Sequence, residues 1–265
     1  MVPPVRVVRR WLVSTFHYIL EILSLVGGTL AMVALLVGAI NYIRGSEDRK
    51  KQKHYAAWQV IIAARGARAS GGRLAAVRDL ALDKVSLHGI DLSGAFLDDI
   101  VLEGSNLIMS NFQRATLNNA KFSNATMFAA HFQGAHGGSV DFTGADLSYV
   151  DLAVVHFLRP RFVEASLANA NLEYANLHEA DLERCDLEST HLRGVNLFNA
   201  NLEGIRNWQS IANLQHANIL GVRNAPEGFR EWALKKMGAE EIQPGEWLQR
   251  HEAEREKIRS MLFQV

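Results

Sequence analysis

Residues 165–202 decide the fold, and they read ASLANANLEYANLHEADLERCDLESTHLRGVNLFNANL. A leucine recurs at every fifth position of this stretch. The same period extends from residue 82 to residue 202, where 24 of 25 positions are Leu, Phe or Met and only Gly137 departs. A helix repeats every 3.6 residues and a strand every 2, so neither keeps these side chains on one face. The period therefore predicts a solenoid whose backbone turns a corner once per repeat.

A small or β-branched residue lies two positions before most of the large apolar residues, often with Asp or Asn between them. Ala170-Asn171-Leu172 and Ala180-Asp181-Leu182 are examples. Tandem A-(D/N)-L-x-x units resemble the pentapeptide-repeat family, and the resemblance covers about half of the chain. It implies an all-β, right-handed quadrilateral β-helix with four repeats per coil. The large residue and the small residue two before it then point inward.

Four repeats per coil place residues 20 apart above one another. The resulting aromatic columns are Phe112 with Phe132, and Phe122 with Phe142 and Phe162. One surface column alternates in charge and predicts a solvated ladder of ion pairs, each contributing about 0 to 1 kcal/mol: Lys121, Asp141, Arg161 and Asp181. His136 stacks with His156 in another column, and with no third ligand beside them we expect surface imidazoles and no metal site.

Three features interrupt the period. Gly137 predicts a local bulge or bend, with a binding notch as the alternative. Pro160 occupies an inward position and is expected to remove one ladder hydrogen bond. The period slips by two residues after Leu202, so residues 207–209 are expected to protrude from the last coil.

Helices are expected to cover both ends of the solenoid. A short helix over residues 73–80 would cap the first coil. Residues 224–238 predict a helix with Pro226 in its first turn, whose apolar face closes the other end. Residues 244–263 predict a second, charged helix, with Trp247 and Leu248 among its candidate contacts.

Residues 22–43 contain no acidic or basic side chain and are long enough as a helix to cross a bilayer core of about 30 Å. They predict a transmembrane helix, and a cleaved signal peptide is the rival interpretation. More basic residues follow the span than precede it, which favours a cytoplasmic repeat domain. The chain is therefore predicted to be a single-pass membrane protein in the inner membrane of a bacterium.

Two groups of residues around this span are candidate contacts. Small residues form one stripe along the predicted helix, where they would pack against another transmembrane helix or against a second copy: Ser24, Gly27, Ala31, Ala34 and Gly38. Basic residues follow the span and are either a topology determinant or a contact for anionic lipid: Arg49, Lys50, Lys51 and Lys53.

The predicted domain order is a basic segment (1–21), the transmembrane helix (22–43), a juxtamembrane linker and cap (44–80), the β-helix (81–222) and a helical cap and tail (223–265). Charge is segregated along this order. Residues 1–80 carry 12 basic and 4 acidic residues, whereas residues 81–205 carry 7 and 16. An acidic rod is unsuited to contact the phosphates of nucleic acid directly.

The sequence shows no phosphate loop, nucleophile motif or metal-ligand cluster, so we predict no enzyme and no cofactor. The function predicted is a membrane-anchored scaffold or accessory subunit that binds a membrane protein through the span and another protein on the β-helix faces. The resemblance also extends to gyrase-protecting pentapeptide proteins, and DNA mimicry is the alternative. A homo-oligomeric membrane assembly is the second alternative.

Overall fold

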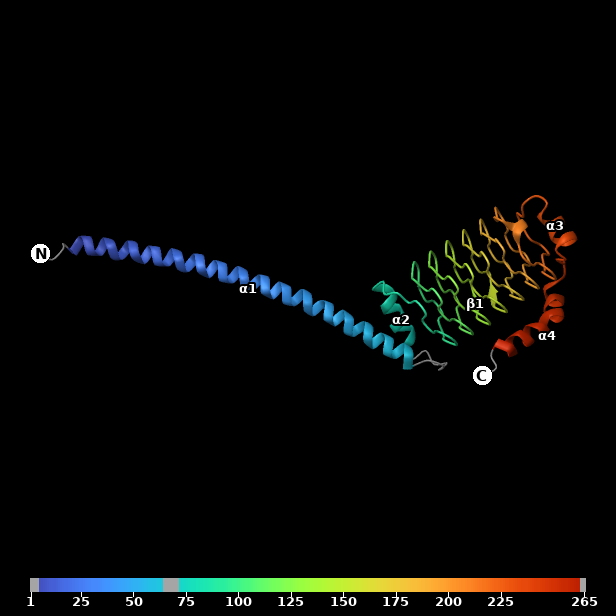
Figure 1. Cartoon of the computed structure of the whole chain (residues 1–265), viewed down its shortest axis with the longest axis horizontal. Coiled ribbons are helices and arrows are strands. Elements are labelled where there is room, and N and C mark those ends of the chain that lie inside the picture. Colours follow the sequence, from blue (N-terminus) through green and yellow to red (C-terminus); the bar gives the residue numbers. More distant parts are fainter. Residues whose placement is uncertain (1–4, 64–71, 263–265) are drawn as a thin grey trace. The chain divides into compact units, whose positions relative to one another are not determined.

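A computed structural model describes residues 5–63 and 72–262, and side chains within the first helix are described only at residues 17, 18, 21, 24, 29 and 32–63. The chain forms two compact units, Met1–Tyr55 and Ala56–Val265. The elements, labelled in Figure 1, are α1 (Val5–Ala63), α2 (Arg73–Leu82), β1 (His136–Gly138), β2 (His156–Leu158), the 3-10 helix η1 (Trp208–Ser210), α3 (Phe229–Lys236) and α4 (Pro244–Leu262).

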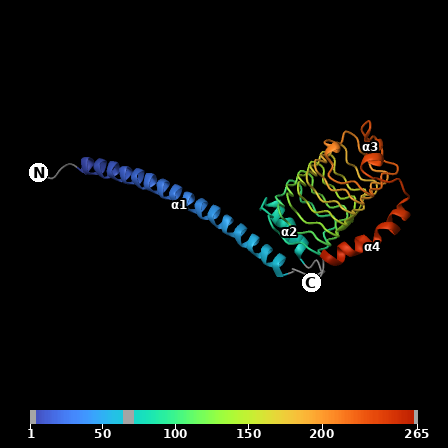
Figure 2. The same ribbon diagram turned by 45° about the vertical axis from the view of Figure 1, so that its right-hand side comes forward.

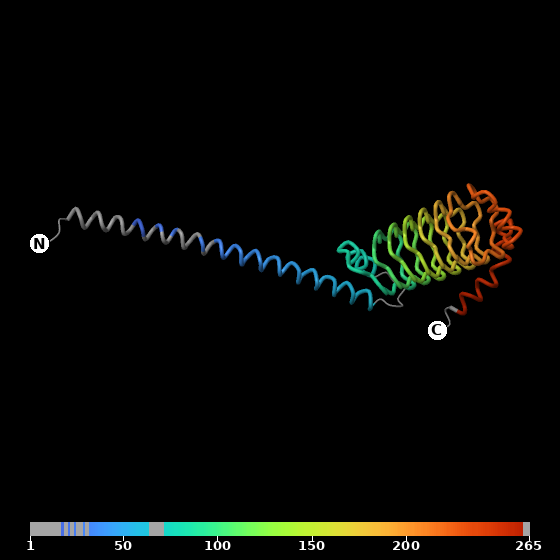
Figure 3. The backbone as a smooth tube through the Cα atoms, turned by 45° about the horizontal axis from the view of Figure 1, so that its top comes forward, coloured from blue at the N-terminus to red at the C-terminus, as the bar shows by residue number. Residues whose placement is uncertain are grey.

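The middle of the chain is a β-helix of stacked coils, which Figure 3 shows as a tube. Parallel bridges join successive coils at a spacing of 20 residues, as in Asp91 to Asn111 and Asn111 to His131, and the spacing becomes 22 residues from the bridge of His191 to Asn213 onward. The Leu92 amide donates to the Asn111 carbonyl at 2.7 Å, and the Asn111 amide donates to the Ile90 carbonyl at 2.8 Å. Four repeats per coil are therefore confirmed.

Most repeats end in a tight turn. In the turn from Leu92 to Ala95, the Ala95 amide donates to the Leu92 carbonyl at 3.2 Å, and Gly94 has a φ of 61°. The Asp91 carboxylate accepts a hydrogen bond from the Ser93 amide at 3.0 Å, which explains the frequent Asp or Asn before the large residue. The residue two after the large one has a positive φ in all 25 repeats from 84 to 204, although 18 of them are not glycine.

The large apolar side chains fill the axis of the coils. Phe142 stacks between Phe122 and Phe162, with ring centroids 5.3 and 5.1 Å apart and the rings nearly parallel. All three are fully buried, so the predicted aromatic column is confirmed. The prediction that the period begins with an inward-pointing Leu82 was wrong, because Leu82 is the last residue of α2 and is 79% exposed.

The two irregular repeats keep the register of the coils. Gly137 lies opposite Phe157 in the parallel pair of β1 and β2, so the repeat contains no bulge, and the backbone bends just after it at Ser139. A Cβ atom at Gly137 would lie 2.8 Å from the carbonyl group of Leu117 in the preceding coil, which explains the glycine. Pro160 removes no ladder bond, because the equivalent amides donate within their own turn, and its carbonyl accepts from the Asp181 amide at 2.9 Å.

Helices cover both ends of the β-helix (Figure 1). At one end α2 buries Ala76, Val77 and Leu80. At the other end α3 buries Phe229 and Ala233, and its predicted first turn at Pro226 lies outside the helix. The expected protrusion at residues 207–209 overlaps η1, where the Trp208 ring packs against Phe229 at 5.6 Å. The last helix, α4, lies along the side of the coils (Figure 2).

The predicted boundaries at residues 21 and 43 fall inside one continuous helix, α1. Within the part of the chain that the structure describes, no helix is long and apolar enough to cross a membrane. The predicted transmembrane helix is therefore not supported there. The side chains of residues 22, 23, 25–28, 30 and 31 of the predicted span lie outside the described ones.

Candidate interaction surface

The turns leave one backbone acceptor per repeat that the coils themselves do not use. In the repeat that contains Phe122, the ladder and the turn use the carbonyls of residues 120, 121, 122 and 123, whereas the carbonyl of Asn124 accepts no hydrogen bond from a described residue. We call this group, at the residue with positive φ, the corner carbonyl. Residues 20 apart stack, so corner carbonyls form columns with a spacing of about 4.8 Å.

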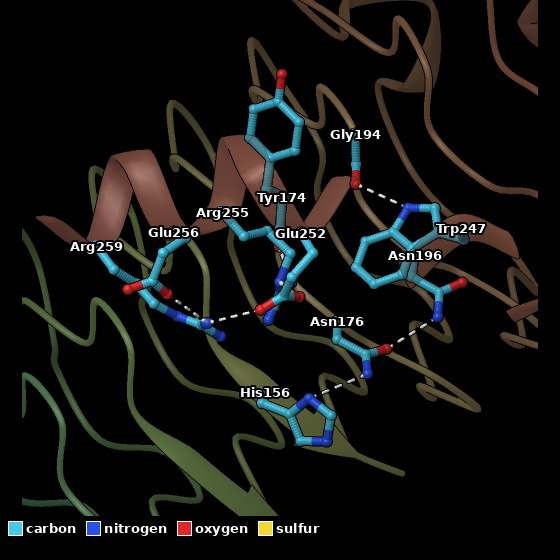
Figure 4. A network of polar contacts seen from close by, with 10 residues as sticks. All are labelled: His156, Tyr174, Asn176, Gly194, Asn196, Trp247, Glu252, Arg255, Glu256 and Arg259. Atoms are coloured by element: carbon cyan, nitrogen blue, oxygen red, sulfur yellow. Dashed lines mark hydrogen bonds and ion pairs between the residues drawn. The ribbon is translucent and has the colours of Figure 1, made fainter. Parts of the chain in front are cut away.

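Among the described residues, four corner carbonyls accept hydrogen bonds from side chains of α2, of the last coil and of α4. Arg78 of α2 donates to Asp99 at 3.0 Å, and Arg206 donates to Arg184 at 3.2 Å. The other two donors belong to α4: Trp247 donates through Nε1 to Gly194 at 3.1 Å, and Arg255 donates to Tyr174. Arginine and tryptophan side chains therefore attach α2 and α4 to the coils at these acceptors, and Figure 4 shows the two that belong to α4, Trp247 and Arg255.

Arg255 is the central contact of α4. Its side chain is 1% exposed, and its guanidinium lies 5.3 Å from the centre of the Trp247 ring. The pKa of Arg255 is lowered to about 10, mainly by burial and in smaller part by the charge of Arg259, while the charge of Glu252 opposes this shift. The Glu252 carboxylate lies 3.8 Å from Nε. The buried cation is thus held by a carbonyl, an aromatic face and one carboxylate.

His251 lies one turn before Arg255 and is also buried, with its ring 5.7 Å from the Tyr174 ring. Burial is the main cause that lowers the pKa of His251, with smaller contributions from the charges of His216, Arg250 and Arg255, whereas Glu240 raises it. The pair that α4 buries against Tyr174 is therefore an imidazole and a guanidinium, with few apolar side chains between them.

A ladder of asparagine amides runs beside α4 along the coils. Asn218 donates to Asn196 at 3.0 Å, Asn196 donates to Asn176 at 2.9 Å, and Asn176 faces Nδ1 of His156 at 3.2 Å. Each amide oxygen also accepts the backbone amide two residues later, as Asn176 does from His178 at 3.3 Å. Asn176 must therefore donate to His156, which accepts at Nδ1 and carries its proton on Nε2 when neutral.

A groove of about 490 Å³ opens between this ladder and the start of α4. His156, Asn176 and Asn196 line it together with Leu158 and Leu248. Leu158 is 40% exposed and Leu248 is 46% exposed, so two aliphatic side chains face solvent beside polar amides and an imidazole. Further lining residues are Arg159, His178, Glu179, Pro244 and Trp247. Such a surface suits a peptide with an apolar side chain and polar backbone groups.

The predicted charge ladder lies in one column. Bridges connect Lys121 to Asp141, Asp141 to Arg161, and Arg161 to Asp181. The structure brings one pair together, with Arg161 Nη1 3.5 Å from Asp141 Oδ2. The Asp181 carboxylate instead accepts a hydrogen bond from Asn201 at 2.9 Å. The column therefore contributes little to stability, because Arg161 is 55% exposed.

The candidate contacts around the predicted span all lie in α1. Ser24 donates to the carbonyl of Glu21 at 2.8 Å, whereas Ala34 and Gly38 are exposed. The side chains at Gly27 and Ala31 lie outside the described ones. The basic residues Arg49, Lys50, Lys51 and Lys53 are exposed. The role of both groups stays a prediction.

The sequence reasoning missed most of the contacts of α4. It expected Trp247, which is buried, and Leu248, which is half exposed. It did not anticipate His251 and Arg255. Their spacing from Trp247 is four and eight residues, which places all three on one helical face. That spacing was visible, but the sequence does not reveal that the face would meet carbonyl oxygens.

Comparison with known proteins agrees with this geometry. The family model described as Pentapeptide repeats matches residues 86–124, 120–153 and 162–204, in eight copies. No curated protein sequence matches the chain. Among solved structures, the chain is similar to a trypsin-treated form of QnrB1, a plasmid-mediated fluoroquinolone resistance protein, with 18% identity, a TM-score of 0.45, and coverage of 62% of this chain and 83% of that one.

Two further solved structures are similar in part. HetL from the cyanobacterium Nostoc, a pentapeptide repeat protein involved in heterocyst differentiation regulation, is 22% identical with a TM-score of 0.20 and coverage of 62% and 90%. A pentapeptide repeat protein from the Arabidopsis thaliana thylakoid lumen is 29% identical with a TM-score of 0.19 and coverage of 55% and 91%. Four repeats per coil and a family model that matches residues 86–124, 120–153 and 162–204 make the β-helix of this chain similar to pentapeptide-repeat proteins.

Proposed function

We propose that this protein is a non-catalytic scaffold that binds another protein on the outer faces of its β-helix. One observation carries the proposal: the interior of the coils is a single continuous cluster of buried apolar side chains from Leu87 to Ile219. The axis is therefore filled, and recognition must use the surface. The groove beside α4 is the part of that surface that combines exposed leucines with polar groups.

The finer proposal is that residues 22–43 of α1 anchor this scaffold in a membrane, with the β-helix in the cytoplasm. Its support is the 22-residue stretch without a charged side chain and the basic residues that follow it. Sodium carbonate washing tests it. The full chain is expected to stay in the membrane fraction, and its release into the supernatant would contradict the anchor.

Co-purification tests the scaffold proposal. The full chain, extracted in mild detergent, is expected to retain the same partner through purification and crosslinking with mass spectrometry. Changing Leu158→Asp and Leu248→Asp places charges in the groove and should reduce the recovered partner at least tenfold. Val101→Asp is the matched control, because Val101 is 47% exposed and lies outside the groove. Equal recovery with all three variants would contradict the groove as the binding surface.

The same preparations test the stripe of small residues. Replacing Gly27, Ala31, Ala34 and Gly38 with leucine prevents close approach of helix backbones. A membrane partner, or a second copy, should then be lost from the complex while the protein itself stays in the membrane. Inhibition of gyrase by the unchanged protein, with no partner recovered, would instead favour DNA mimicry.

A further inference from the structure

One corner of the β-helix carries a strip of uncharged residues along an otherwise charged rod. The two residues after each large core residue form a corner of the coil, and residues 20 apart stack into a corner column. The other three corner columns of the same coils include charged residues such as Glu103, Arg114 and Arg159. We call the uncharged column over four consecutive coils the uncharged strip: Ile108, Met109, Phe128, Ala129, Ser148, Tyr149, Ala168 and Asn169.

The large side chains of the uncharged strip face solvent. Met109 is 57% exposed, Phe128 is 42% exposed and Tyr149 is 56% exposed. The rings of Phe128 and Tyr149 lie against each other, with centroids 5.2 Å apart. Protein interfaces are enriched in methionine and aromatic residues, and charged residues are depleted from their centres. The strip therefore has the composition of a contact surface.

The two flat faces beside the strip are also nearly neutral. Their ladder residues are Asn106, Thr126, Asp146 and Ser166 on one face, and Asn111, His131, Asp151 and Asn171 on the other. Both carboxylates among them are used within the coils, since Asp146 accepts from the Ser148 amide at 3.0 Å and Asp151 accepts from Gln133 at 2.6 Å. The rod as a whole is acidic, with 7 basic and 16 acidic residues over positions 81–205. Two such rods therefore repel each other least where these neutral surfaces meet.

The strip is complementary in size to itself when a second copy approaches in the opposite direction. A twofold axis that crosses the rod between the coils of Phe128 and Ser148 places each coil of the strip opposite a different coil of the second copy. A larger side chain then faces a smaller one in every pair, as close packing requires. The facing pairs are Ile108 with Ala168, Met109 with Asn169, Phe128 with Ser148, and Ala129 with Tyr149. Just beyond the strip, His88 of one copy faces Glu188 of the other, which adds a pair of opposite charge when the imidazole is protonated.

We propose that two copies of this protein associate through the uncharged strip as an antiparallel twofold dimer. Tyr149 of each copy packs on Ala129 of the other. The first and last corners of the strip are three coil spacings apart, about 14 Å, which is short for an interface of standard size. The dimer is therefore weak and dissociates on dilution.

The dimer goes beyond the scaffold function and is compatible with it. The groove beside α4 includes the corner formed by Leu158 and Arg159, two repeats after the corner of Ser148 and Tyr149. With four repeats per coil, the two corners are diagonally opposite. Both grooves of the dimer therefore stay open to a partner protein.

Sedimentation of the full chain in mild detergent tests the association. The dimer fraction should rise with protein concentration over about 1 to 100 μM. Tyr149→Asp places a charge in the strip and should weaken the association at least tenfold. Tyr149 has a φ of 59°, which aspartate adopts more readily than most residues, so the fold is retained. Val101→Asp is the matched control, because Val101 is 47% exposed on another column, and it should leave the association within twofold.

Disulfide crosslinking tests the direction of the pairing. Met109→Cys and Asn169→Cys are combined in one chain, where the two thiols are three coils apart, about 14 Å, and too distant for a disulfide within the chain. An antiparallel dimer brings each of them opposite the other in the second copy. The double variant should therefore crosslink into dimers under mild oxidation, and each single variant should not. The native Cys185 is buried and does not interfere.

The proposal is overturned if the full chain stays monomeric over this range, if Tyr149→Asp associates as strongly as the unchanged protein, or if the double variant fails to crosslink. Crosslinking of Met109→Cys alone would also overturn it, because that result requires a parallel pair. None of these results affects the scaffold function, which fails separately if partner recovery is insensitive to the groove variants at Leu158 and Leu248.

Discussion

At the scale of single residues, the turns explain most of the sequence pattern and one of its exceptions. Where Asp or Asn precedes the large residue, its side chain accepts a hydrogen bond from an amide that the ladder does not use, as Asp91 does from Ser93. The period and these residues were readable from the sequence. The positive φ at residues such as Tyr174 and Val154 was not, because such residues rarely adopt it. Stacking of the coils imposes that conformation where local preference opposes it.

Gly137 provides a test at this scale. Gly137→Ala should destabilise the protein by about 1 to 3 kcal/mol, because the new Cβ atom would lie 2.8 Å from the Leu117 backbone. Gly138→Ala is the control, since its nearest contact is 3.8 Å away and neither glycine has a positive φ. Chemical denaturation measures both. Equal stability of the two variants would show that the backbone of the coils shifts to accommodate the new Cβ atom.

At the scale of elements, α4 differs from an ordinary amphipathic helix. Its buried face contains Trp247, His251 and Arg255, and two of these donate to backbone carbonyls. The sequence predicted the helix and its bounds closely, because Pro244 and the charged composition mark it. It could not predict the contact, since the acceptors belong to residues 53 and 81 positions earlier in the chain.

Burial of His251 makes the attachment of α4 sensitive to acid. The lowered pKa of His251 means that the detached helix binds a proton more readily than the packed one. The stabilisation of packed α4 by neutral His251 is therefore complete at a pH above 6.5, the ordinary pKa of histidine, and is lost as the pH falls below that value toward the lowered pKa of the packed state. The groups that face this imidazole are Tyr174, His216, Glu240, Arg250 and Arg255.

Hydrogen exchange of α4 measures this effect. Protection of its amides should fall between pH 7.5 and pH 5, and His251→Gln should remove most of that change. His191→Gln is the control, because His191 is exposed and lies on another column of the coils. An unchanged pH dependence in His251→Gln would assign the acid sensitivity to another group, such as His156.

At the scale of the whole β-helix, stability comes from the stacked interior and little of it comes from surface charge. The sequence predicted this core almost residue by residue, because burial of one side chain per repeat is a strictly periodic requirement. Only Leu82 at the start deviated, since the capping helix α2 extends over it. The helix α1 was predicted as separate segments, because Glu21 and Arg44 border the stretch without charged side chains and marked boundaries that the backbone does not have.

The aromatic column tests this view. Phe142→Ala should lower the free energy of unfolding by about 3 to 5 kcal/mol, because Phe142 is stacked between two other rings and its removal leaves a cavity. Phe128→Ala is the matched control and should cost less than about 1 kcal/mol, since Phe128 is 42% exposed. Equal decreases in the free energy of unfolding, measured by urea denaturation, would mean that the interior repacks to fill the space left by Phe142.

Four repeats per coil also constrain how such a chain can change length. Inserting five residues advances every later repeat by one side, so each downstream contact would rotate by a quarter turn away from its upstream neighbours. Inserting 20 residues restores the angle and only moves those contacts one coil further along the axis. Docking surfaces that extend over several coils, such as the column under α4, therefore tolerate the gain or loss of whole coils and are disrupted by that of single repeats.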